Sequence, residues 1–395
     1  MLSLRLVRRF STLPHIVPTT AIARRKPIKV DEPALVKLKN ERDPEKLFVL
    51  FKANAHNKVV IENRFAFEDT VSRLAGAGRF DYIENLLEQQ KTLPQGRREG
   101  FILRIIMLYG SAGMTKHAID TFSNMHLYGC KRTVKSFNAA LKVLTQSRDL
   151  GAIESFFSNV SSRFGIELDV YSVNIVLKAF CEMGILEKAF LLMVKMEKLG
   201  IVPDVISYTT LIAAFYKASR PEIANGLWNL MVLKGCLPNT ATFNVRIQFL
   251  VNKGRAWEAN KLLAFMRSKK FSDEVTYNLV IKGFMVAGYL EMAMRVYTAF
   301  HSEGYKPNQK VYQTMIHYLC GAGKFDMAYQ MFKESMQNNW FPSVHTINNL
   351  LEGLRKEGKN DGIDKAKYIY SLTLKRVPPF SAAQIKAMKS ILSKN

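Results

Sequence analysis

Residues 274–308 read EVTYNLVIKGFMVAGYLEMAMRVYTAFHSEGYKPN, and this stretch decides the fold. Its first half carries apolar residues at helical spacing, namely Tyr277, Val280, Ile281 and Phe284. Gly288 interrupts the periodicity, which then resumes until Gly304 and Pro307 mark the end of a second helix. The small Ala293 suits a close approach of two paired helices, because a larger side chain there would overpack. The pattern therefore predicts a helix, a tight turn and a second helix.

The same pattern recurs along the chain with a period of about 35 residues. Turn glycines are separated by 35, 71, 70, 34, 35 and 35 residues: Gly78, Gly113, Gly184, Gly254, Gly288, Gly323 and Gly358. Alanines fall five or six residues after a turn position: Ala118, Ala189, Ala224, Ala259, Ala293 and Ala328. Pairs that begin with proline close the units: Pro203-Asp204, Pro238-Asn239, Pro307-Asn308 and Pro342-Ser343. Three markers on one period predict a repeat protein.

Aligned on these markers, the chain contains eight full units: 64–98, 99–133, 134–169, 170–204, 205–239, 240–273, 274–308 and 309–343. Residues 31–63 are predicted to form an N-terminal helical half-repeat, and 344–395 an irregular ninth repeat with a C-terminal cap. One helix pair cannot bury its apolar face alone, whereas stacked neighbours can. The sequence therefore predicts an all-α, right-handed α-solenoid with a concave groove.

Composition excludes several classes of protein. The chain has 395 residues, of which 48% are hydrophobic, as in a folded protein. No stretch approaches the roughly 18 uninterrupted apolar residues that a membrane-spanning helix needs. The four cysteines lie at least 51 residues apart, which disfavours a zinc module and a secreted disulfide framework. The formal charge of +24 indicates a polyanionic partner, with nucleic acid as the first candidate and an anionic membrane surface as the second.

The first 30 residues form a segment of their own. They contain seven basic residues and no acidic one, and Leu and Val alternate with Arg5, Arg8 and Arg9. An Arg-rich, acid-free, amphipathic start is typical of an organelle transit peptide. The sequence RRFST at 8–12 resembles plant mitochondrial processing sites. We therefore expect import into the mitochondrial matrix, with the chloroplast as a minor alternative and a basic nucleic-acid-binding tail as another reading.

The units resemble the pentatricopeptide repeat family. VYSVNIVLKAFCEMGILEKAFLLMVKMEKLGIVPD (170–204) and the stretch at 274–308 follow the family pattern almost position by position. Tetratricopeptide repeats have a shorter, 34-residue period and lack the recurring Tyr/Phe-Asn and the terminal Pro-Asp or Pro-Asn. The uniform unit length resembles the P-type branch, and 38–52 and 79–91 look like the N-terminal region of short plant members. The resemblance implies RNA binding without catalysis, and no catalytic motif, cofactor motif or metal spacing is present in the sequence.

In this family the fifth and the last residue of a unit together contact one base. Carried over to this chain, the pairs are Asn138/Asp169, Asn174/Asp204, Thr209/Asn239, Asn244/Asp273 and Asn278/Asn308. The resemblance assigns Asn–Asp to uracil, Thr–Asn to adenine and Asn–Asn to cytosine, which implies the RNA sequence UUAUC. Glu68/Arg98, Leu103/Thr133 and Gln313/Ser343 depart from the code, so the site is short.

The residue types also support this assignment on physical grounds. Asn is a poor helix-interior residue, so a column of amides along successive first helices points to recognition of base edges. The terminal Asp and Asn residues also fit helix N-caps, and we expect most of them to cap as well. At the second position, which sandwiches bases in the family, Tyr171, Ile206 and Val275 are candidates for base stacking. Lys135 and Lys310 depart from that pattern and favour phosphate contacts.

Three functions remain open from the sequence. The first is a mitochondrial protein that binds single-stranded RNA, either messenger or ribosomal, and acts on RNA metabolism or translation without catalysis. The second is a structural component of the mitochondrial ribosome that holds ribosomal RNA beside ribosomal proteins. The third is a peptide-binding adaptor, which the positive charge disfavours.

Overall fold

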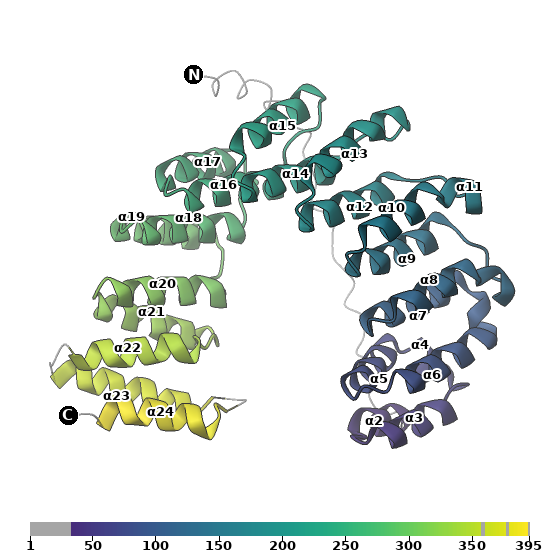
Figure 1. Cartoon of the computed structure of the whole chain (residues 1–395). Coiled ribbons are helices and arrows are strands. Elements are labelled where there is room, and N and C mark those ends of the chain that lie inside the picture. The colour runs from purple at the N-terminus through teal and green to yellow at the C-terminus, as the bar shows by residue number, and fades with distance from the viewer. Residues whose placement is uncertain (1–32, 357–359, 377–378, 394–395) are drawn as a thin grey trace. The chain divides into compact units, whose positions relative to one another are not determined.

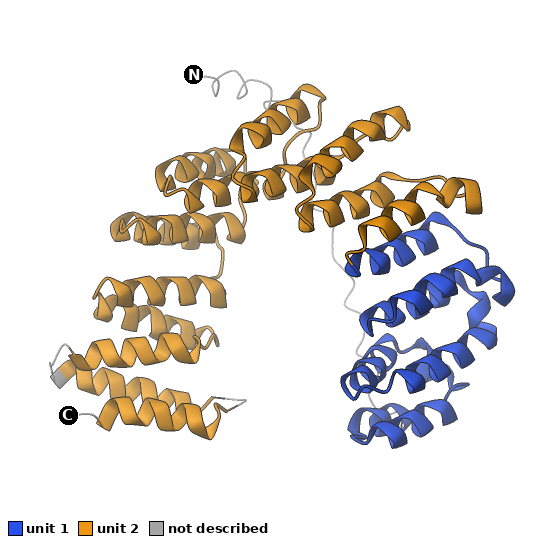
Figure 2. Cartoon of the chain, viewed as in Figure 1, with its two compact units in different colours: residues 1–147 blue, residues 148–395 orange. Residues whose placement is uncertain are grey.

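The computed structural model describes residues 33–356, 360–376 and 379–393. Every regular element in these residues is a helix (Figure 1). The chain divides into two compact units, residues 1–147 and residues 148–395 (Figure 2). The predicted transit peptide at 1–30 lies outside the described residues.

The first unit is a stack of short helices. Its α-helices are α2 (Pro33–Asn40), α3 (Pro44–Ala53), α4 (Lys58–Glu62), α5 (Arg64–Gly76), α6 (Phe80–Thr92), α7 (Glu99–Ser111), α8 (Thr115–Ser123) and α9 (Val134–Gln146). Two 3₁₀ turns, η2 (Pro94–Arg97) and η3 (Met125–Tyr128), follow α6 and α8. Helices α5, α7 and α9 contact one another in sequence order, and α2, α3 and α4 pack against α5. The N-terminal helices therefore cover the apolar face of the first hairpin.

The second unit repeats one helical hairpin. Its helices are α10 (Leu150–Ser158), α11 (Val160–Phe164), α12 (Val170–Glu182), α13 (Leu186–Lys198), α14 (Val205–Lys217), α15 (Pro221–Leu233), α16 (Thr240–Asn252), α17 (Ala256–Ser268), α18 (Glu274–Val286), α19 (Leu290–Ser302), α20 (Gln309–Gly321), α21 (Phe325–Gln337), α22 (Val344–Lys356), α23 (Asn360–Leu374) and α24 (Ala382–Ser393). The even-numbered helices from α12 to α24 each contact the next one, so they form a continuous layer. Within each hairpin the second helix packs against the first, and α24 packs on both α22 and α23.

The hairpin turns explain two gaps in the glycine spacing. Gly184 adopts the left-handed conformation with φ 78°. Arg148 and Ser219, which stand where the sequence skips a glycine, adopt the same conformation with φ 57° and 56°. The turn at Ser219 closes when the amide of Arg220 donates to the carbonyl of Phe215 at 2.9 Å. Such a conformation costs a residue with a Cβ about 1–2 kcal/mol, so these turns keep the repeat geometry without glycine.

Small and aromatic side chains share the core of the second unit. The alanine marker of the second helices is completely buried at Ala189, Ala224, Ala259, Ala293 and Ala328, which confirms the predicted close approach of paired helices. The fourth residue of successive first helices is an equally buried aromatic: Tyr208, Phe243, Tyr277 and Tyr312. Phe300 at the end of α19 stacks on Tyr305 with ring centroids 5.4 Å apart. The core is therefore distributed along the stack, one layer for each hairpin.

The cysteines have structural environments. All four are free. Burial raises the pKa of the Cys181 and Cys320 thiols to about 12. These two thiols therefore stay protonated at neutral pH and are poor nucleophiles. Their positions fit packing within the first helices, as the repeat pattern indicates.

Candidate nucleic-acid interface

The second residues of three first helices are apolar and yet exposed. Tyr171 on α12, Ile206 on α14 and Val275 on α18 are 54%, 60% and 55% exposed. Residues three or four apart on a helix lie on one face. The second, fifth and ninth residues of each first helix therefore share a surface, which we call the first-helix face. An exposed apolar side chain in each of three stacked repeats suits contact with flat rings.

The last residue of each repeat caps the helix that follows it. Asp169, Asp204, Asn239, Asp273 and Asn308 are the N-cap residues of α12, α14, α16, α18 and α20. In α14, for example, the Ser207 amide donates to Asp204 Oδ1 at 2.8 Å. The expected capping role is thus confirmed. It also fixes the position of each terminal side chain beside the first-helix face.

Two of the five sequence-predicted pairs are joined by a direct hydrogen bond. Asn174 Nδ2 donates to Asp204 Oδ1 at 3.0 Å, and Asn244 Nδ2 donates to Asp273 Oδ1 at 3.1 Å. In both pairs the described hydrogen bonds use Oδ1 of the aspartate. The structure therefore brings the fifth and last residues of these repeats together, with a second carboxylate oxygen left to accept from a ligand.

The next two pairs are connected differently. Thr209 Oγ1 lies 2.7 Å from Thr242 Oγ1, which in turn donates to Asn239 Oδ1 at 3.0 Å. Asn278 Oδ1 is buried and has no hydrogen-bond partner among the described residues. Its partner Asn308 accepts from the Lys310 amide at 3.0 Å. Thr209 and Asn239 are therefore linked through a third side chain, whereas Asn278 and Asn308 are not linked.

The remaining predicted pair is divided between the two units. Asn138 lies on α9 of the first unit and is only 5% exposed. Asp169 lies in the second unit, where it accepts from the Ser172 amide at 2.7 Å. Each side chain is thus held by its own unit.

Hydroxyl groups beside these pairs were missed in the sequence analysis. The third residue of a first helix contacts the preceding repeat at Ser207, Thr242 and Thr276. The signal that could have found them is a capping box, in which Ser or Thr stands three residues after the terminal Asp or Asn. The structure shows that box at α12, α14, α16 and α18.

Positive charge accompanies the first-helix face. Lys178 and Lys282 occupy the ninth position of α12 and α18, and Lys217 lies one turn beyond the ninth position of α14. Lys310 replaces the apolar second residue in α20. All four lysines are exposed. Amides, exposed apolar side chains and lysines on one helix face make up the usual set of contacts to single-stranded nucleic acid.

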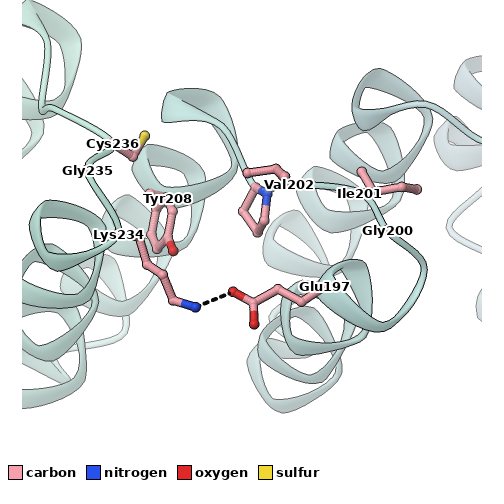
Figure 3. A pocket seen from close by; sticks show the side chains of 9 residues that line it. Glu197, Gly200, Ile201, Val202, Tyr208, Lys234, Gly235 and Cys236 are labelled. Atoms are coloured by element: carbon pink, nitrogen blue, oxygen red, sulfur yellow. Dashed lines mark ion pairs between the residues drawn. The ribbon is translucent and has the colours of Figure 1, made fainter.

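A pocket of about 500 Å³ lies at the junction between two repeats (Figure 3). It is lined by the loop at 200–203, by Tyr208 and by the segment at 234–236. Glu197 and Lys234 approach each other to 2.9 Å across it. This ion pair already neutralises the charged groups of the pocket, so it offers no unpaired charge to a ligand.

Other kinds of site were searched for in the same way. In the part of the chain that the structure describes, no group of three or more His, Cys, Asp or Glu side chains could hold a metal ion. Among the same residues, no helix is both long enough and apolar enough to cross a lipid bilayer.

Models of known families match much of the chain. The model of the PPR repeat family matches residues 168–217, 203–252, 272–320 and 307–356. The model of the single PPR repeat matches residues 104–130.

Three relatives from Arabidopsis thaliana are similar over long stretches. A mitochondrial pentatricopeptide repeat-containing protein is 64% identical over 245 residues, which span 60% of this chain and 61% of that protein. The small ribosomal subunit protein mL103 is 33% identical over 96% of this chain and 91% of its own length. A second mitochondrial pentatricopeptide repeat-containing protein is 32% identical over 99% of this chain and 92% of its own length.

Proposed function

The chain belongs to the pentatricopeptide repeat family, and from this premise we propose that it binds single-stranded RNA without catalysing a reaction. The observation that carries the proposal is the paired side chains Asn174–Asp204 and Asn244–Asp273, which are held together beside the first-helix face. Amide and carboxylate groups can read the edges of unpaired bases. The exposed side chains of Tyr171, Ile206 and Val275 are then available to stack on those bases.

Each base is contacted by one repeat in this proposal. The pairs Asn138/Asp169, Asn174/Asp204, Thr209/Asn239, Asn244/Asp273 and Asn278/Asn308 would read UUAUC from 5′ to 3′. In the Asn–Asp repeats, the free Oδ2 of the aspartate would accept the N3–H of uracil, while the remaining amide N–H of the asparagine would donate to a base oxygen. Cytosine has no N3–H, so it would leave the carboxylate facing an acceptor.

The location that we propose is the mitochondrial matrix. The basic, acid-free segment at 1–30 supports import. Two of the relatives from Arabidopsis thaliana are mitochondrial proteins by name.

A second candidate function is a structural role in the mitochondrial ribosome. It is supported by the similarity to mL103, which extends over 96% of this chain. It is also supported by the lysines at the second positions of α9 and α20, Lys135 and Lys310, which suit phosphate contacts better than base stacking. In that case RNA would be held mainly by shape and charge, beside ribosomal proteins. Sucrose-gradient sedimentation of the native protein separates the two candidates: exclusive migration with one ribosomal subunit, lost on magnesium chelation, favours the ribosomal role.

We expect the protein to bind single-stranded RNA more tightly than a duplex of the same sequence. Bases must be unpaired to reach the side chains of the first-helix face. The measurement is competition of labelled UUAUC-containing RNA by the unlabelled single strand and by its duplex. Equal competition by both would mean that only phosphates are held, and would contradict base reading.

The substitution Asn308→Asp should move the preference of its repeat from cytosine towards uracil. The aspartate can still cap α20, because its oxygen accepts the same backbone N–H groups that Asn308 now holds. It also gives Asn278 the carboxylate partner that Asn174 and Asn244 have. Relative affinity for UUAUU over UUAUC should rise by about 1–3 kcal/mol, the usual scale for one base.

The added negative charge of this variant weakens binding to every RNA, so only the ratio of the two affinities is informative. The matched control is Asn308→Ser, which keeps a capping oxygen and adds no charge. If Asn308→Asp lowers both affinities in parallel, the repeat does not read its base, and the ribosomal role becomes the better account.

A further inference from the structure

A hydroxyl group of one repeat contacts the base-reading asparagine of the repeat before it. Ser207, the third residue of α14, lies 2.6 Å from Asn174 Oδ1 and 3.0 Å from Asp204 Oδ1. Thr276, the third residue of α18, lies 2.6 Å from Asn244 Oδ1 and 2.7 Å from Asp273 Oδ1. In both places one hydroxyl joins the two members of a proposed base-reading pair.

These contacts fix the direction of the asparagine amide. A carboxylate can only accept hydrogen bonds, so Asp204 must face the NH₂ group of Asn174. The amide oxygen of Asn174 then faces Ser207, whose hydroxyl has a proton to donate. Turning the amide over would place oxygen against oxygen at Asp204 and forfeit the bond from Ser207. Asn174 therefore has one favoured orientation before any RNA arrives.

The repeat between these two uses the same position. Thr242, the third residue of α16, lies 2.7 Å from Thr209 Oγ1 and 3.0 Å from Asn239 Oδ1. The asparagine oxygen can only accept, so the proton of Thr242 is directed to Asn239. The proton of Thr209 is then the one shared between the two threonines or offered to a base. Three successive repeats thus have their polar pairs bridged by a hydroxyl from the next helix.

The bridge is missing in the following repeat. The third residue of α20 is Val311, which is completely buried and has a methyl group where the other helices have a hydroxyl. The terminal residue of the repeat is the amide Asn308, so no carboxylate faces Asn278 either. Correspondingly, Asn278 Oδ1 is buried without a hydrogen-bond partner among the described residues. Nothing in its described surroundings selects one orientation of the Asn278 amide.

We propose that Ser207, Thr242 and Thr276 are positioning residues for base specificity, and that Val311 makes the repeat at 274–308 the least discriminating of the four. This inference rests on the proposed RNA-binding function. Helix capping alone does not account for the contacts, because the N-cap bond at Asp204 comes from the backbone amide of Ser207. The additional bond to Asn174 reaches into the preceding repeat, where it contributes nothing to that cap. A polar group whose donor direction is preset pays less on binding than one that must be ordered.

The loss-of-function test is Ser207→Ala in the full chain. Affinities are measured for UUAUC-containing RNA with U or C at its second base, which faces the repeat at 170–204, and with U or C at its fourth base. We expect the U-over-C ratio at the second base to fall about fivefold or more, the scale of one lost hydrogen bond to a polar group. The ratio at the fourth base, which faces the pair Asn244/Asp273, should not change. Ser207→Thr restores the hydroxyl and should restore the ratio.

The gain-of-function test is Val311→Thr, which has nearly the shape of valine and supplies the missing donor to Asn278 Oδ1. We expect the ratio between C and U at the fifth base to rise at least about threefold, again the scale of one hydrogen bond. Melting temperatures are measured for every variant, because a role in capping alone would shift them while changing affinity for all bases equally. That outcome, or unchanged ratios in both variants while the parent protein discriminates, would overturn the inference. A parent protein without any base preference would overturn the base-reading function itself.

Discussion

Raising the monovalent salt concentration tenfold, from about 50 to 500 mM, is expected to weaken RNA binding about a thousandfold. Each phosphate neutralised on a single strand contributes roughly 0.7 to the slope of log affinity against log salt. Four exposed lysines accompany the first-helix face of the second unit: Lys178, Lys217, Lys282 and Lys310. Lys135 and Lys142 occupy the second and ninth positions of α9 in the first unit. Four to six phosphate contacts give a slope of about −3 to −4.

The slope can be traced to the proposed surface by comparing two double variants. Lys178→Gln with Lys282→Gln removes two charges from the first-helix face, and should make the slope less steep by about 1.4. Lys195→Gln with Lys198→Gln removes the same charge from exposed positions on the second helix α13 and should leave the slope nearly unchanged. A salt slope near zero for the parent protein would reject RNA as the partner and favour a peptide ligand.

The substitution Phe300→Ala should destabilise the chain by about 3–5 kcal/mol, the usual cost of deleting a buried phenylalanine side chain. Phe300 is completely buried at the end of α19. Its ring lies 5.4 Å from that of Tyr305 in a stacked arrangement and 5.4 Å from that of Tyr277 edge to face. The cavity would loosen the contact between α18 and α19, on which the neighbouring hairpins depend. Urea unfolding of the full chain measures the loss.

Phe65→Ala is the matched control, because Phe65 on α5 is 78% exposed and its removal should change stability by no more than about 0.5 kcal/mol. Hydrogen exchange then locates the effect of Phe300→Ala, which should be greatest for amides of α18 and α19. Equal destabilisation by the two substitutions would contradict the assigned core.

Much of the fold was predictable because the repeat imposes the same requirement many times. The buried alanine and the turn glycine each occur once per hairpin, so their spacing reveals the helix pairs even where one marker is missing. The sequence could not indicate that Arg148 and Ser219 adopt the left-handed turn, because neither residue type favours it. It also did not indicate the break between α10 and α11, or the short α8 followed by a 3₁₀ turn. Those departures depend on how local segments pack, which the period does not encode.

The candidate site was only partly predictable. The column of Asn and Thr residues and the terminal Asp and Asn residues are visible in the sequence, and so is their capping role. The hydrogen bond from Asn174 to Asp204 joins residues 30 positions apart, so it depends on the hairpin geometry. The contribution of Ser207 was missed because its side chain belongs to one repeat and its partner to the previous one. That contact, and the contrast with Val311, required the structure. Whether any of these side chains touches a base stays a prediction.

The hydroxyl bridge also determines where this chain can be cut and recombined. A module excised from 170 to 204 contains Asn174 and Asp204 but leaves behind Ser207, which orients them. Grafted in front of a helix whose third residue is valine, that module would arrive with the same two letters of the code and a different side-chain environment. Designed arrays assembled from such modules should therefore be joined after the third residue of the following helix, at Ser207 or Thr276, so that each recognition pair travels with its own hydroxyl.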